Sequence, residues 1–167
     1  WGNFSSLYTV VLIVASIALA LLGFRDDYIK TVLKRKDGLA PRTKMAVQII
    51  IALSVALIVY FFPSNVKYKT DLFVPFMNEA LIDLGYLWIV FAVVVIIGSS
   101  NAVNLTDGLD GLAIGTVAIV ASVLAIMCYL SGHVKIAEYL HIPYIPAGAE
   151  LTVYLSALVG ASIGFLW

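Results

Sequence analysis

Three consecutive stretches of this sequence decide its fold: LGYLWIVFAVVVIIGSS (Leu84–Ser100), NAVNLTDGLDG (Asn101–Gly111) and LAIGTVAIVASVLAIMCYL (Leu112–Leu130). The outer two are apolar enough to cross a lipid bilayer, whereas the middle one is strongly polar. Four of its polar side chains recur at every third position: Asn101, Asn104, Asp107 and Asp110. An Asp at mid-bilayer costs about 2.5–3.5 kcal/mol on insertion scales, so acids beside membrane spans normally mark a site. The middle stretch therefore predicts where the chemistry takes place.

The composition is that of an integral membrane protein. Of the 167 residues, 62% are hydrophobic and 12% are charged, whereas a soluble domain is about half apolar and a quarter charged. The single cysteine, Cys128, excludes an internal disulfide. Apolar runs without alternation favour helices over barrel strands. We therefore expect an all-α, polytopic transmembrane helix bundle with five spans: Leu7–Phe24, Met45–Phe62, Leu84–Ser100, Leu112–Leu130 and Leu151–Trp167.

The basic residues predict how the chain is oriented in the membrane. Seven of the ten Lys and Arg residues fall between the first two spans: Arg25, Lys30, Lys34, Arg35, Lys36, Arg42 and Lys44. Cytoplasmic loops are enriched in Lys and Arg, so we expect this first loop to be cytoplasmic. Counting spans then places 101–111 on the same face, and 66–83 and 133–150 outside. Because the chain begins with Trp and stops at Trp167, we interpret it as the middle part of a larger protein.

A second acidic feature, the pair Asp26-Asp27, ends the first span. Mg²⁺ prefers one or two carboxylates together with substrate phosphates, and crowding of like charges can tune one carboxylate for general-base work. The alternative is an ordinary charge pair between Asp26 and Lys30 at helical spacing. Lys30 and Lys44 lie at the inner mouths of the first two spans, where a lipid phosphate would lie. They either bind that phosphate or only orient the protein.

The three-residue spacing of 101–110 makes a prediction about the backbone. On a regular α-helix these side chains would spread over opposite faces, whereas a 3₁₀ turn or a broken helix would align them. Gly108 and Gly111 favour such a break. The alternative interpretations are a polar helix–helix contact, and a transporter or channel that uses the acids as a proton or cation relay. A relay predicts acids near span centres, but here they lie at span ends. A purely structural membrane subunit would leave the acids unexplained.

Asn101–Ala113 (NAVNLTDGLDGLA) resembles the signature of the bacterial phospho-N-acetylmuramoyl-pentapeptide transferases, a branch of the polyprenyl-phosphate sugar-phosphate transferases. Three further segments are similar to that family in the same order: GFRDDYIK (Gly23–Lys30), HIPYIPAGAELTV (His141–Val153) and VGASIGFLW (Val159–Trp167). The resemblance implies Mg²⁺-dependent transfer of phospho-MurNAc-pentapeptide from UDP-MurNAc-pentapeptide to undecaprenyl phosphate, which yields lipid I and UMP for peptidoglycan synthesis. It also implies a ten-helix, multi-pass protein of the bacterial cytoplasmic membrane, a cytoplasmic cleft and, in many members, a homodimer. The related branch that transfers N-acetylhexosamine phosphate from a UDP-N-acetylhexosamine to a polyprenyl phosphate is the alternative.

The resemblance also implies roles for individual residues. Asp26 would be the catalytic base or phosphate-positioning acid, Asp27 would lie beside it as a second catalytic acid, and both would be metal ligands. The third acidic ligand of the family is expected beyond Trp167. A formal net charge of zero gives no indication of a nucleic-acid partner. The substrate-binding residues would be Asn101, Asn104, Asp107, Gly108, Leu109 and Asp110, the last three at the uracil, together with Lys30 and Lys44.

Overall fold

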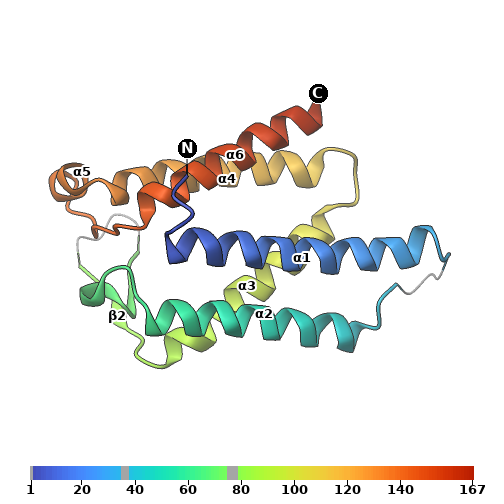
Figure 1. The fold of residues 1–167 in the computed structure, drawn as a ribbon, viewed down its shortest axis with the longest axis horizontal. Coiled ribbons are helices and arrows are strands. Elements are labelled where there is room, and N and C mark those ends of the chain that lie inside the picture. Colours follow the sequence, from blue (N-terminus) through green and yellow to red (C-terminus); the bar gives the residue numbers. More distant parts are fainter. Residues whose placement is uncertain (1, 35–37, 75–78) are drawn as a thin grey trace.

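The computed structural model describes residues 2–34, 38–74 and 79–167 (Figure 1). In these ranges five long helices, each apolar enough to cross a membrane, follow the five predicted spans: α1 (Leu7–Thr31), α2 (Pro41–Phe61), α3 (Leu87–Thr106), α4 (Leu112–Gly132) and α6 (Gly148–Leu166). The shorter elements are η1 (Val66–Tyr68), β1 (Asp71–Leu72), β2 (Ile82–Asp83) and α5 (Val134–Tyr139). The predicted all-α membrane fold is thus confirmed. Two basic residues of the first loop, Arg35 and Lys36, lie outside the described residues.

Several helices extend beyond the predicted spans, because polarity ends an apolar run without ending a helix. The stretch 25–31 contains neither Gly nor Pro, so the backbone hydrogen bonds of α1 continue past Phe24 to Thr31. At the next helix, Pro41 occupies the first turn, where its missing N–H costs nothing, so α2 begins before Met45. Likewise α3 continues past Ser100 to Thr106. Six site candidates therefore lie on helices: Asp26, Asp27, Lys30, Lys44, Asn101 and Asn104.

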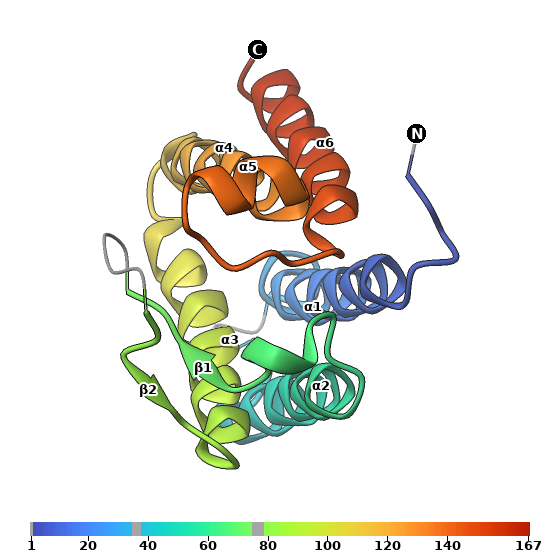
Figure 2. The ribbon, with the colours of Figure 1, turned by 90° about the vertical axis from the view of Figure 1, so that its left-hand side faces the viewer.

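The helices alternate in direction, and this sorts the loops onto two ends of the bundle. Figure 1 shows the carboxyl ends of α1, α3 and α6 and the amino ends of α2 and α4 toward one end. The strands and α5 lie at the opposite end, as Figure 2 shows from that side. We call the first the acidic end, because Asp26, Asp27, Asp107 and Asp110 lie there, and the second the hairpin end, because β1 and β2 lie there. This arrangement places the first loop and 107–111 at the same end, as the span count predicts.

The closest contact between helices joins α4 and α6, whose backbones meet at two glycines. A Cβ built on Gly148 would lie 2.6 Å from the carbonyl oxygen of Cys128, and one on Gly132 would lie 2.3 Å from the backbone nitrogen of Ala149. Small residues permit such close approach in membranes, where packing rather than exclusion of water drives association. Elsewhere α1 lies between α2 and α6 (Figure 2), and the Tyr154 hydroxyl donates to Ser16 Oγ at 2.7 Å.

Aromatic side chains gather at the hairpin end. The rings of Tyr60 and Tyr86 lie 5.9 Å apart, and Lys69 Nζ lies 3.7 Å from the centre of the Tyr60 ring. Antiparallel pairing of Asp71 with Asp83 and of Leu72 with Ile82 forms the adjacent hairpin. Tyrosines at this level are typical of the interface between lipid and water. The hairpin end therefore lies at one membrane surface and the acidic end at the other.

Candidate functional site

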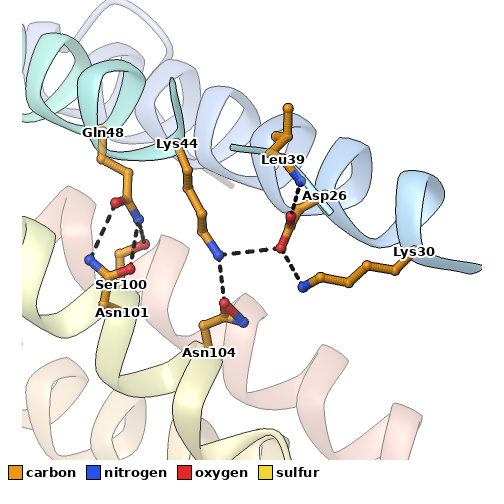
Figure 3. Close-up of polar contacts among 8 residues, drawn as sticks. All are labelled: Asp26, Lys30, Leu39, Lys44, Gln48, Ser100, Asn101 and Asn104. Atoms are coloured by element: carbon orange, nitrogen blue, oxygen red, sulfur yellow. Dashed lines mark hydrogen bonds and ion pairs between the residues drawn. The ribbon is translucent and has the colours of Figure 1, made fainter. Parts of the chain in front are cut away.

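The candidate site forms where α1, α2 and α3 meet at the acidic end (Figure 3). Asp26 lies at its centre. This residue is only 3% exposed although its side chain is ionisable. Its neighbour Asp27 is exposed. A buried carboxylate is costly unless it is paired and hydrogen-bonded. The contacts of Asp26 therefore determine how the site is built.

Three donors surround the Asp26 carboxylate. Lys30 Nζ lies 2.7 Å from Oδ2 and Lys44 Nζ lies 3.4 Å from the same oxygen. The backbone N–H of Leu39 donates to Oδ1 at 2.8 Å. The ordinary Asp26–Lys30 pair expected as the alternative is present, but it is part of a larger cluster that also draws in the next helix. The cluster holds two cations beside one carboxylate, so it is suited to binding further anions.

Lys44 connects this cluster to the polar signature on α3. Its Nζ donates to Asn104 Oδ1 at 2.6 Å as well as to Asp26 (Figure 3). Three helices thus contribute one side chain each to a continuous chain of charge-assisted contacts, Asp26–Lys44–Asn104. Such contacts are roughly twice as strong as neutral hydrogen bonds.

One helical turn deeper, Gln48 connects the same two helices. Its Nε2 lies 3.2 Å from Ser100 Oγ and 3.3 Å from Asn101 Oδ1, while Asn101 Nδ2 donates to Gln48 Oε1 at 3.2 Å. Gln48 is buried, at 3% exposure. Gln48 and Ser100 belong to no motif and were not among the predicted site residues. The available signal was a lone amide within an apolar span, four residues after Lys44.

The reciprocal amide pair predicts coupling between Gln48 and Asn101. Either Gln48→Leu or Asn101→Leu should cost about 1–2 kcal/mol of unfolding free energy, because each removes both amide bonds between α2 and α3 and leaves the partner amide only one other bond. The double variant should cost less than the sum, by about 1 kcal/mol. Chemical denaturation in detergent micelles measures all three. Ser54→Ala, which removes only a local bond to Ile50, is the control, and strictly additive losses would show that the pair is not formed.

A hollow of about 190 Å³ opens between the three helices beside these contacts. Apolar residues of α1 and α3 line part of it, and charged and amide groups line the rest. A ligand with a phosphate group and an apolar portion matches this division. The lining residues are Leu19, Leu22, Gly23, Asp26, Asp27, Lys44, Gln48, Ser100, Val103, Asn104 and Asp107.

The signature is interrupted as predicted, by a turn between two helices. Asp107 follows the last helical residue, with its N–H bonded to the carbonyl of Val103. Gly111 has φ +80°, a left-handed conformation that favours glycine, and α4 begins after it. The break brings Asp107 to the hollow together with Asn104. Gly108, Leu109 and Asp110 are exposed and lie outside its lining.

The carboxylates available to a metal ion are limited. Within the described ranges, no three His, Cys, Asp or Glu side chains are grouped closely enough to hold an ion. Both oxygens of Asp26 already accept hydrogen bonds. Asp27 and Asp107 contribute carboxylates to the lining of the hollow, and Asn104 contributes an amide oxygen. These are hard oxygen donors of the type that Mg²⁺ prefers, and too few to hold it without substrate oxygens and water.

The chain belongs to glycosyl transferase family 4, whose profile matches residues 9–167. It is similar to proteins named phospho-N-acetylmuramoyl-pentapeptide-transferase. It is 47% identical to that of Thermodesulfovibrio yellowstonii over the whole chain and 46% of the relative. Identity is 48% with that of Aquifex aeolicus, over 96% of this chain and 43% of the relative. With that of Leptospira biflexa it is 46%, over the whole chain and 48% of the relative.

These comparisons confirm the resemblance drawn from the NAVNLTDGLDGLA signature. The chain spans about half the length of the curated relatives that it matches. Together with the five apolar helices, they establish a multi-pass membrane protein of this family.

Proposed function

We propose that this chain forms part of the active site of an enzyme that transfers phospho-MurNAc-pentapeptide from UDP-MurNAc-pentapeptide to undecaprenyl phosphate, releasing UMP. The observation that carries the proposal is the contact chain Asp26–Lys44–Asn104. It lies at one end of a membrane bundle, beside a hollow with polar and apolar walls. A water-soluble nucleotide and a lipid phosphate would meet at such a place. A relay buried near the centres of the spans would suit a transporter instead.

The charges at the site suit phosphoryl transfer, which requires positioning and neutralisation more than covalent help from the protein. Lys30 and Lys44 supply the cations. Asp26 is proposed to position them, so that phosphate oxygens replace part of their contacts when substrate binds. Because both Asp26 oxygens already accept N–H groups, an aspartyl intermediate would require those contacts to break first. We therefore favour direct attack by the lipid phosphate.

Mg²⁺ is the proposed cofactor. Asp27 and Asp107 would hold it, with the substrate diphosphate and water completing the oxygen ligands. Asp26 is the weaker candidate ligand, since a metal at its carboxylate would have to displace a lysine. When bound, Mg²⁺ neutralises charge that develops on the phosphates.

The excess of Lys and Arg at the acidic end supports a cytoplasmic site in the bacterial cytoplasmic membrane. A homodimer is proposed on the family resemblance alone.

A transfer assay tests the proposal in a protein of the relatives' full length that contains this chain. UMP release should require both UDP-MurNAc-pentapeptide and undecaprenyl phosphate, and chelation should abolish it. Release from UDP-N-acetylglucosamine would favour the related hexosamine branch instead. No release from either donor would contradict the proposal.

The assignment of Asp110 to uracil gives a separate prediction. The N3–H of uracil is a donor that this carboxylate can accept, so Asp110→Ala should weaken UMP binding by about tenfold or more. Asp107→Ala should weaken UMP binding and also lower turnover, because Asp107 lines the hollow. Calorimetry with UMP measures the binding, and Glu138→Ala at the hairpin end is the control. Equal UMP affinity in the wild type and Asp110→Ala would place the nucleotide elsewhere.

A further inference from the structure

The segment that leads into α2 approaches the buried carboxylate with its backbone. Gly38 has φ +61°, in the left-handed region, and the next residue, Leu39, donates its N–H to Asp26 Oδ1 at 2.8 Å. We infer that Gly38 is a positioning residue of the active site, which brings the Leu39 N–H onto Asp26 and so fixes the orientation of its carboxylate. This inference deepens the proposed function and rests on it.

A side chain at this position would displace the side chains of Asp26 or Lys30. A Cβ built on Gly38 would lie 2.4 Å from Asp26 Oδ1 and 2.6 Å from Lys30 Cε. Contacts under 3.0 Å force something to shift, and here the group that must shift is the central carboxylate or the lysine paired with it. A second requirement is conformational, because an L side chain is strained at this φ. Gly85 has a similar φ of +51°, but a Cβ there would meet nothing within 4 Å. Comparing an alanine substitution at Gly38 with one at Gly85 therefore separates the effect of steric collision from that of backbone strain.

The two carboxylate oxygens of Asp26 have different partners. Oδ1 is held by the backbone, which leaves Oδ2 for Lys30 and Lys44. A backbone donor carries no net charge, so it orients the carboxylate without competing with a phosphate for the cations. If the carboxylate turns, the 3.4 Å contact between Asp26 Oδ2 and Lys44 Nζ is lost, and the contact chain between the three helices breaks.

Gly38→Ala in the full-length protein tests this inference. We expect kcat to fall on the order of 100-fold, the scale of a catalytic group displaced by about 1 Å. KM for UDP-MurNAc-pentapeptide should stay within about twofold, because positioning for the reaction is lost rather than nucleotide binding. Gly85→Ala, which imposes similar backbone strain at the hairpin end, should keep kcat within about twofold. An equal loss of kcat in both variants would overturn the inference.

A stability cycle tests the geometry without relying on activity. Gly38→Ala should lower the melting temperature more in the wild type than in an Asp26→Ala background, where the collision with the carboxylate is gone and only the backbone strain and the contact with Lys30 remain. An equal decrease in both backgrounds would show that Gly38 does not pack on Asp26, which also overturns the inference. If Gly38→Ala yields too little folded protein, Gly38→Asn carries the same expectations, since Asn tolerates this φ better but keeps a Cβ.

The two proposals fail in different ways. If the wild type shows no transfer from either UDP-sugar, the proposed function fails, while the stability cycle still decides whether Gly38 packs on Asp26. If the wild type is active and Gly38→Ala matches Gly85→Ala in kcat, only the positioning role fails.

Discussion

Asp26→Asn should reduce lipid-product formation by about three orders of magnitude in the full-length protein, the size of loss that follows removal of a charged catalytic group. The amide keeps the shape of the carboxylate, and its oxygen can still accept the Leu39 N–H. It carries no charge, however, and turns an NH₂ group toward Lys30 and Lys44. The two lysines then lose the group that positions them for phosphate. The measurement is turnover with both substrates at saturation.

Folding of this variant should be nearly intact, which separates catalysis from stability. The side chains of Lys30 and Lys44 are 41% and 21% exposed, so water can solvate both ammonium groups once the carboxylate is gone. Asp83→Asn is the matched control, because Asp83 is an exposed acid at the hairpin end. Its turnover should equal that of the wild type. If Asp26→Asn keeps a tenth of normal activity, Asp26 is not a catalytic group.

Gly148→Ala should destabilise the bundle by about 2–3 kcal/mol, the usual cost of overpacking a well-packed contact. The added methyl group would meet two backbone atoms of α4, the carbonyl oxygen of Cys128 at 2.6 Å and the nitrogen of Gly132 at 3.1 Å. Neither can rotate away as a side chain could. The helices must therefore separate along their closest contact. Chemical denaturation in detergent micelles measures the loss.

Gly160→Ala on the same helix should not destabilise the bundle. A Cβ there meets nothing within 4 Å, so the substitution adds only helix propensity, worth up to about 1 kcal/mol. We expect an unchanged or slightly raised stability. If both variants lose stability equally, the close packing of α4 on α6 is not the cause.

The amino-acid sequence predicted those structural features that depend on side-chain polarity along the chain alone. Apolar length predicts a membrane helix, and all five predicted spans became helices. The polar signature predicted a break, because Gly108 and Gly111 follow an acid where the apolar run ends, and the chain turns there. Helix ends were less predictable. The i→i−4 hydrogen bond continues through charged residues, so α1 includes Asp26 and Lys30.

The same sequence could not show which polar groups meet. The helical spacing of Asp26 and Lys30 allowed the prediction of an ion pair between them, and the structure contains that pair. The contact with Lys44 depends on how α1 packs against α2, and the contact with Asn104 depends on where α3 lies. Gln48 carried no motif, and its role depends on a partner 53 residues away.

The sequence by itself thus determined the membrane fold, the number of spans and the segments that carry chemistry, because these follow from side-chain polarity along one chain. Only the tertiary structure decided that Asp26 is buried, that Lys44 bridges it to Asn104 and that the backbone at Gly38 approaches Asp26 closely. Burial and close approach depend on distances between helices that are far apart in sequence. Those distances are set by packing of whole helices, as where Gly132 and Gly148 let α4 and α6 touch, and no local pattern of residues encodes them.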